Sequence, residues 1–291
     1  MPDLITHMSF NYIIYKIYRK RFNLILFLAG AIIPDLPISL KIFLIDFLHY
    51  YQNIEYISAL THLLHTLLIS LLFSISIGVL FEKVFGSIIS LYTGILLHLF
   101  LDFLQNSWSN GLLLFFPFYN KPFSLNLFTY GIEFKYFYVI LPALILVYLW
   151  RKERAHLKFT LNFKRISISI GILILIILIS WLNIEKVINS GVLCLDFRFN
   201  SQKYDNRIIV LNRTPVVSVE PIKIYYRGKK LTLENVKIPL KKHDKVILKG
   251  IYKHNQSRIN VIEIHRVNFI KQIISFTGLL FFLCIVIRSL I

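Results

Sequence analysis

A series of long, uninterrupted apolar runs constrains the fold of this chain more than any other feature. Each run is close to the roughly 20 residues that a helix needs to cross the hydrocarbon core of a bilayer. The candidate spans are residues 22–40, 58–82, 86–105, 134–150, 166–183 and 270–287, and segment 4–18 is either a short first span or an interfacial helix. Only 16% of the 291 residues are charged, against about a quarter in soluble proteins. The sequence therefore predicts an α-helical polytopic membrane protein with about six to seven spans.

Between residues 190 and 268 the pattern changes from continuous apolar runs to short alternating ones. Segments such as DKVILKGIYK (244–253) and RINVIEIHRV (258–267) are rich in β-branched residues and are bounded by turn-forming residues. They predict a small all-β domain of about five to seven strands, inserted before the last span and similar to an OB-type barrel. The expected organisation is therefore a helical membrane domain over 1–185, a basic β domain over 190–268 and a C-terminal transmembrane helix over 270–291.

Positive charge predicts how the spans are oriented. The short loop 151–165 carries six Lys and Arg against one Glu, and segment 16–21 is also basic. Loops of this kind stay in the cytoplasm. Threading outward from these two anchors places the β domain on the opposite side of the membrane. The chain has only two cysteines, too few for a disulfide framework or a cysteine zinc site.

The stretch GILLHLFLDFL (94–104) places two polar side chains within an apolar segment. His98 and Asp102 are four residues apart, so on a helix they lie on one face, one turn apart. A charged residue at mid-membrane costs on the order of 2.5–3.5 kcal/mol on insertion scales. A buried pair of this kind therefore needs a partner, although a structural hydrogen bond between the two is the simpler explanation for the pair taken alone.

Further polar residues lie at the ends of other apolar segments that the predicted topology brings to the same side. They are Asp3, His7, Asp35, His62 and His65. Each has an ordinary structural explanation by itself: a helix cap, a helix end set by proline, or an interfacial histidine. Their convergence instead favours one shared divalent cation. Carboxylate and imidazole ligands without cysteine suit zinc best, with manganese or iron as alternatives.

The order of these motifs resembles a known family. The chain reads PDLITH near its start, then GAIIPDLP, then a His-x-x-His-Thr motif, then HLFLDFLQNSWSNGLLLFFPF. It is similar to the membrane-bound predicted metal-dependent hydrolases, a family usually described by its LexA-regulated bacterial inner-membrane member. The resemblance covers roughly residues 1–150 and implies a multi-pass protein of the cell (inner) membrane.

The resemblance also implies site residues. The ligand set would be His7, Asp35, His65, His98 and Asp102, with Gly111 and Pro117–Phe118 shaping the loop that follows. Thr61–His62 and His65–Thr66 each match half of the family's histidine motif. Which of His62 and His65 takes the family role therefore stays open at this point.

The chemistry that would follow is hydrolysis. Asp3 is the nearest candidate in the sequence for the group that accepts the proton of an attacking water, although it equally suits an N-cap of the first helix. The family is distantly similar to zinc-dependent phospholipase C and single-strand nuclease folds, which points to a phosphoester. A site at the boundary between lipid and water makes a lipid or lipid-linked (phospho)ester the expected substrate. Segment 107–128 would be a lid over the site or an aromatic belt.

The β domain shows no catalytic pattern, but it is strongly basic. Residues 191–268 contain sixteen Lys and Arg against six Asp and Glu. We expect its partners to be membrane lipids with anionic headgroups rather than nucleic acid, because the predicted topology places the domain outside the cytoplasm. Two alternatives for the whole chain remain: a transporter or proton-relay protein that uses the intramembrane His and Asp, and a non-catalytic anchor that presents the β domain.

Overall fold

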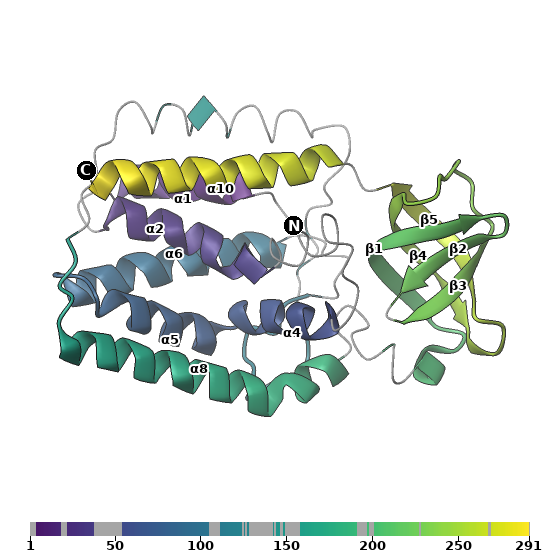
Figure 1. The fold of residues 1–291 in the computed structure, drawn as a ribbon, viewed down its shortest axis with the longest axis horizontal. Coiled ribbons are helices and arrows are strands. Elements are labelled where there is room, and N and C mark those ends of the chain that lie inside the picture. The colour runs from purple at the N-terminus through teal and green to yellow at the C-terminus, as the bar shows by residue number, and fades with distance from the viewer. Residues whose placement is uncertain are drawn as a thin grey trace.

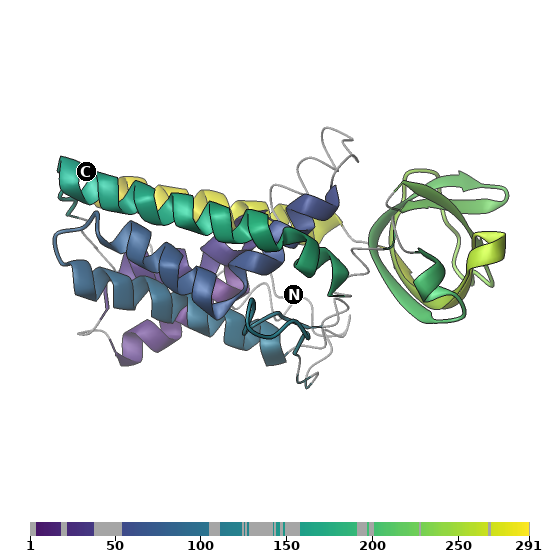
Figure 2. The same cartoon turned by 90° about the horizontal axis from the view of Figure 1, so that it is seen from below.

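The computed structural model describes two parts of the chain, a bundle of helices and a small β barrel (Figure 1). The helices lie side by side, and the barrel lies beyond one end of them in both ribbon views (Figure 2). The described residues are 4–18, 22–37, 54–104, 111–123, 125, 127, 142, 144, 145, 148, 158–190, 197, 201–226, 228–266 and 269–290.

The helical half is built from seven described α-helices and one short 3-10 helix. They are α1 (Leu4–Ile17), α2 (Leu24–Ile32), η1 (Ile33–Asp35), α4 (Ile54–Leu64), α5 (Leu67–Gly78), α6 (Val84–Leu104), α8 (Phe163–Asn189) and α10 (Phe269–Leu290). Helix α10 returns the chain to its beginning, because Ile285 of α10 is buried in the same apolar cluster as Leu4 and Met8 of α1. The first and last helices of the chain are therefore neighbours in space.

Two of the described helices, α6 and α8, are long and apolar enough to cross a membrane, and the α4–α5 pair would be a third if it forms one bent span. The expected six to seven spans are thus not confirmed. The predicted segment 58–82 is divided into α4 and α5, which are bent by 76°. The described part of segment 22–40 contains the short α2 and η1, followed by the helical residues 36–37. The predicted span 134–150 lies largely outside the described residues.

Glycine packing brings α2 and α6 into close contact. A Cβ atom on Gly30 would lie 2.5 Å from the carbonyl oxygen of Leu91, and one on Gly94 would collide with the carbonyl oxygen of Phe27. Asn11 of α1 donates from Nδ2 to the carbonyl oxygens of Phe27 and Gly94, at 3.1 Å each. These contacts tie α1, α2 and α6 together near the polar residues that they carry.

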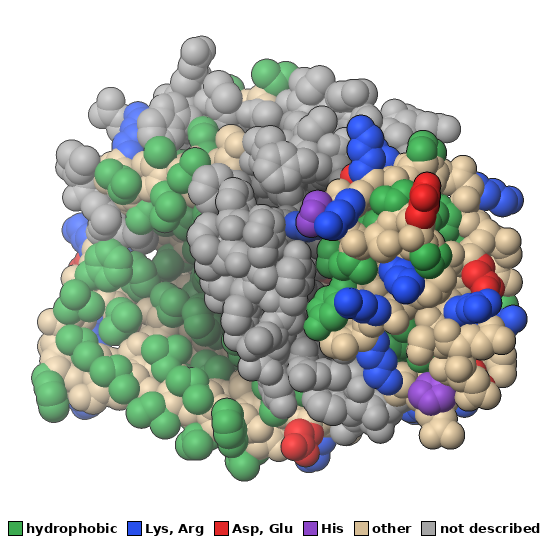
Figure 3. All heavy atoms as spheres, turned by 45° about the vertical axis from the view of Figure 1, so that its right-hand side comes forward, with side chains coloured by type: hydrophobic (Ala, Val, Ile, Leu, Met, Phe, Trp, Pro, Cys, Tyr) green, Lys and Arg blue, Asp and Glu red, His purple; other side chains and the backbone are tan. Residues whose placement is uncertain are grey.

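The surface of the two halves differs as the sequence predicts. Apolar side chains dominate the visible surface of the helical half, whereas Lys, Arg, Asp and Glu gather on the barrel (Figure 3). On α8, Trp181 and Leu182 are 76% and 74% exposed. Large apolar side chains this exposed indicate a surface covered by lipid.

The β domain is a closed five-stranded barrel with its own core. The strands are β1 (Ile208–Val219), β2 (Ile222–Tyr226), β3 (Lys229–Glu234), β4 (Lys245–Lys253) and β5 (Arg258–Arg266). Their order around the barrel is β1-β2-β3-β5-β4; the β3–β5 pair is parallel and the others are antiparallel. Alternation along β4 explains the core, because Val246, Leu248 and Tyr252 point inward and are nearly inaccessible.

Candidate metal centre

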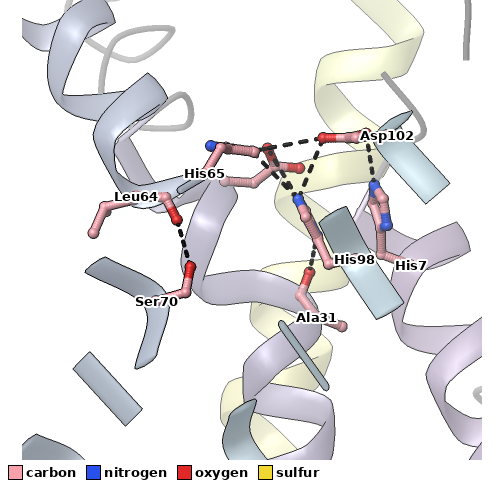
Figure 4. A network of polar contacts seen from close by, with 8 residues as sticks. His7, Ala31, Leu64, His65, Ser70, His98 and Asp102 are labelled. Atoms are coloured by element: carbon pink, nitrogen blue, oxygen red, sulfur yellow. Dashed lines mark hydrogen bonds and ion pairs between the residues drawn. The ribbon is translucent and has the colours of Figure 1, made fainter. Parts of the chain in front are cut away.

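Four polar side chains from three parts of the helical half converge on one buried point (Figure 4). They are Asp35 at the end of η1, His65 between α4 and α5, and His98 and Asp102 one turn apart on α6. Each residue offers one ligand atom, and these atoms all lie within 4.8 Å of one another. All four residues are at least 94% buried, since their exposed fractions are 6%, 1%, 0% and 3%.

The distances between these atoms are longer than those of ordinary hydrogen bonds. Oδ2 of Asp102 lies 3.5 Å from Nε2 of His98 and 3.6 Å from Nε2 of His65. Oδ1 of Asp35 lies 3.9 Å from Nε2 of His98 and 3.6 Å from Nε2 of His65, and these two nitrogens are themselves 3.4 Å apart. An N–H···O bond is usually about 2.9–3.0 Å long.

The same distances are those expected of ligands that share a cation. Two ligand atoms, each about 2.1 Å from a tetrahedral zinc ion, lie about 3.4 Å apart. Moreover, neither carboxylate oxygen of Asp102 makes a hydrogen bond within the described part of the chain, although both are buried. Buried carboxylates without such partners are costly, so the donor set fits a divalent cation on spacing, burial and chemistry.

A backbone carbonyl fixes the orientation of His98. Its Nδ1 lies 2.8 Å from the carbonyl oxygen of Ala31 in α2. Because a carbonyl oxygen can only accept, Nδ1 carries the proton and donates it, and Nε2 is the ring nitrogen that faces Asp35, His65 and Asp102. An outer hydrogen bond of this kind is typical of metal-ligating histidines, since it sets both tautomer and ring orientation.

The break between α4 and α5 positions His65. Thr66 is the N-cap of α5, and its Oγ1 accepts from the backbone N–H of Ile69 at 3.3 Å. The backbone N–H of Leu67 donates to the carbonyl oxygen of Leu114 at 2.9 Å. The position of His65 therefore depends on the break between α4 and α5, which one continuous helix over 58–82 would lack.

Two histidines of the predicted set lie outside the four-residue cluster. The ring of His7 stacks on that of His98, with 3.9 Å between centroids, and its Nε2 lies 3.5 Å from Oδ1 of Asp102, the oxygen that does not face His65. His62 is buried in the last turn of α4 but is not among the four clustered residues. Asp3, the predicted proton acceptor, lies outside the described residues.

Segment 111–127 links two of the ligand-bearing elements. It meets the α4–α5 break through Leu114, and the N–H groups of Leu125 and Leu127 donate to the carbonyl oxygens of Phe103 and Leu104 at the end of α6, at 3.0 and 2.9 Å. The predicted turn residue Gly111 has φ +103°, and a Cβ there would collide with the backbone of Phe123. Only glycine accepts such a conformation and approach easily.

Sequence reasoning missed three contributors to this geometry. The carbonyl of Ala31 has no side-chain signature, and the capping role of Thr66 depends on where the helix breaks. Asn11 had a signal that could have been used, because an amide inside an apolar helix needs hydrogen-bond partners.

The fold and the cluster define a class: a membrane protein with two carboxylates and two imidazoles buried between apolar helices. The sequence profile of the family described as "YdjM inner membrane protein" matches residues 3–187. Because this match covers more than half of the chain, the protein belongs to that family, and the resemblance inferred from the motifs is confirmed. The match ends before the barrel. Searches of the curated proteins and of the solved structures gave no match.

Proposed function

We propose that this protein is a membrane-embedded metal-dependent hydrolase with Asp35, His65, His98 and Asp102 as its metal ligands. The observation that supports this most directly is the spacing of their buried donor atoms, 3.4–3.9 Å between the nitrogens and oxygens quoted above. Zinc is the proposed ion, because two imidazoles and two carboxylates form a common zinc ligand set; manganese or iron would be the alternatives.

The metal would supply the chemistry, and the chain's own residues would hold it in place. A bound divalent ion polarises an ester and lowers the pKa of a water molecule next to it. Ala31 keeps Nε2 of His98 directed inward, and His7 packs against His98 while its own Nε2 faces Asp102. We propose that His7 supports these two residues from outside the cluster; a ligand role for His7 or His62 and a proton-accepting role for Asp3 stay predictions.

We propose a lipid or lipid-linked (phospho)ester as the substrate. The cluster lies within an apolar helical bundle, and the neighbouring segment 111–127 exposes large apolar side chains. Phe115, Phe118 and Tyr119 are 51%, 86% and 43% exposed. Aromatic residues of this kind gather at the boundary between lipid and water. A site next to them would be reached more readily by a molecule dissolved in the membrane than by one dissolved in water.

Metal content of matched histidine variants tests the proposal. Purified protein should contain close to one zinc ion per chain by mass spectrometry. His65→Ala should lose it, with affinity falling at least about 100-fold, since even outer-shell changes cost 10–100-fold. His62→Ala is the matched comparison, because it removes a buried imidazole three residues away: retained metal would support the four-residue ligand set, and loss of metal would extend the set to His62. A folded, metal-free protein would instead favour the transporter or the non-catalytic anchor.

Hydrolysis itself requires a second measurement. Zinc-loaded protein in lipid nanodiscs should cleave a member of a panel of phosphoesters and lipid esters, and Asp102→Asn should abolish cleavage. Activity that is equal in Asp102→Asn would assign the cleavage to a contaminant. Binding of zinc without any cleavage would retain the metal site but contradict the hydrolase assignment.

We also propose that the protein crosses the cell inner membrane several times and that the barrel lies outside the cytoplasm. The support is the basic loop at 151–165 and the positive-inside rule. Lys230 is exposed on β3, so Lys230→Cys should react with a membrane-impermeant thiol reagent added to intact cells whose outer membrane has been permeabilised. Labelling that occurs only after lysis of the inner membrane would contradict this orientation.

A further inference from the structure

The outer face of the barrel carries aliphatic side chains where three strands meet. The register places Ile208 of β1 opposite Ile251 of β4. In β5, Ile262 is the bulged residue between Val261 and Glu263, which pair with Gly250 and Lys249 of β4. Ile208 and Ile262 are 57% and 55% exposed. Single exposed isoleucines are common, but here two exposed isoleucines and the half-buried Ile251 lie on three adjacent strands.

Lysines alternate with these isoleucines. Along β4 the outward positions are Lys245, Ile247, Lys249, Ile251 and Lys253, because the residues between them point into the core. Val210 of β1 lies opposite Lys249. We call this surface the isoleucine–lysine face and define it as Ile208, Val210, Lys249, Ile251, Lys253 and Ile262.

The acidic residues near this face offset only part of its positive charge. Glu234 pairs with Arg258 at 2.8 Å and Asp244 with Arg266 at 3.0 Å. Glu263 lies opposite Lys249 in the register and contacts His265 at 2.7 Å. Within the described part of the chain, Lys249 and Lys253 make no salt bridge. The barrel also has a large excess of positive charge, so this face attracts an anionic partner.

The chain keeps the barrel next to a membrane. It enters the barrel after α8 and leaves it into α10, both of which are apolar helices. In Figures 1 and 2, strand β1 lies on the side of the barrel nearest to the helices. A tethered domain meets its own membrane surface at a high effective concentration.

The chemistry of the face suits headgroups better than nucleic acid. Lysine stems pack along apolar surface while their ammonium groups reach phosphates, and aliphatic side chains insert at the boundary between headgroups and acyl chains. Single-stranded nucleic acid is usually bound on aromatic stacking platforms, and the isoleucine–lysine face contains no aromatic residue.

We propose that the isoleucine–lysine face docks on the anionic lipid surface of the membrane that holds the helices. Docking would hold the barrel flat against the bilayer, with Ile208, Ile251 and Ile262 among the headgroups and Lys249 and Lys253 bound to lipid phosphates. This inference does not depend on the metal centre, because it rests only on residues of the barrel and on its attachment to two apolar helices.

An environment-sensitive fluorophore on the full-length chain tests the docking. The probe is placed at Ile208→Cys after Cys194→Ser and Cys284→Ser have removed the native thiols, and the protein is reconstituted in nanodiscs. We expect a blue shift, and quenching by brominated lipid, with phosphatidylglycerol but not with phosphatidylcholine. The control is Lys230→Cys on β3, which lies across the barrel from β1 and β4 in the strand order and should show neither effect.

Matched charge variants separate the face from the overall charge of the barrel. Lys249→Gln with Lys253→Gln should lower the docked-to-free ratio about 25-fold, since each lysine near an anionic surface contributes about five-fold. Lys230→Gln with Lys237→Gln removes the same charge from other exposed positions and should leave the ratio nearly unchanged. Equal effects of both pairs, or no response at position 208 in anionic nanodiscs, would overturn the proposal. A response to a short oligonucleotide in phosphatidylcholine nanodiscs would also overturn it, in favour of nucleic acid.

Discussion

The two halves of this protein place their polar side chains in opposite ways. The barrel buries Leu211, Leu248 and Ile259 and keeps its charged side chains outside. Burial of apolar side chains is therefore enough to explain its fold. The helical half exposes isoleucine, leucine and tryptophan and buries His98 and Asp102. Apolar burial alone does not explain the second arrangement. The comparison indicates that a functional site is to be sought where polar side chains are buried beneath an apolar surface.

The contrast also predicts that the halves are stabilised independently. Leu248→Ala removes a fully buried side chain from the barrel core and should lower its free energy of unfolding by about 2–5 kcal/mol. The metal content of the helical half should not change. All three tryptophans precede the barrel in the sequence, so tryptophan fluorescence follows the helices while hydrogen exchange of β4 follows the barrel. A simultaneous loss of metal would show that the halves depend on each other.

A smaller effect is expected from the close contact between α2 and α6. Gly94→Ala forces a methyl group against the backbone of Phe27 and should destabilise the helical half by about 1–3 kcal/mol, as overpacking does. It should also weaken metal binding, because α2 carries Ala31 and α6 carries His98. Both effects can be measured by thermal unfolding with and without zinc.

Gly86→Ala is the matched control on the same helix. A Cβ there meets no atom within 4 Å, and alanine favours a helix over glycine by about 1 kcal/mol. This variant should be neutral or slightly stabilising. If Gly86→Ala and Gly94→Ala behaved alike, the close approach of the two helices would be refuted.

The smallest effect concerns Asn11. Asn11→Leu keeps the size of the side chain but removes both donations to α2 and α6. Hydrogen bonds between membrane helices average about 0.6 kcal/mol each, so the loss should be about 1 kcal/mol. Unfolding in a detergent titration measures it, and a loss of several kcal/mol would show that Asn11 does more than tie three helices.

The sequence predicted the parts of the structure that depend on local spacing. His98 and Asp102 share a face because they are one helical turn apart, and the alternation in KVILKGIYK (245–253) defines β4. The position of Asp35 at a helix end is also predictable, because Pro34 directly before it interrupts the helix. In each case the relevant neighbours are within a few residues along the chain.

Features that depend on distant contacts were not predictable in this way. The choice between His62 and His65 depends on the helix break at Thr66, which is held by a hydrogen bond between Leu67 and Leu114. The number of spans stays a prediction, because two of the described helices, or three if α4 and α5 form one bent span, are long and apolar enough to cross a membrane. Hydropathy does not reveal that segment 58–82 bends or that α2 gives way to a 3-10 helix at Ile33. Apolar composition records burial or lipid contact but not the length of a straight helix.

X-ray absorption spectroscopy at the zinc edge, on the full-length protein in nanodiscs, tests the central claim most directly. The account predicts a first shell of nitrogen and oxygen only, at about 2.0–2.1 Å, with the scattering pattern of two imidazoles, and loss of bound zinc when His98 is replaced by alanine. A sulfur shell at about 2.3 Å, or a spectrum unchanged in His98→Ala, would contradict it.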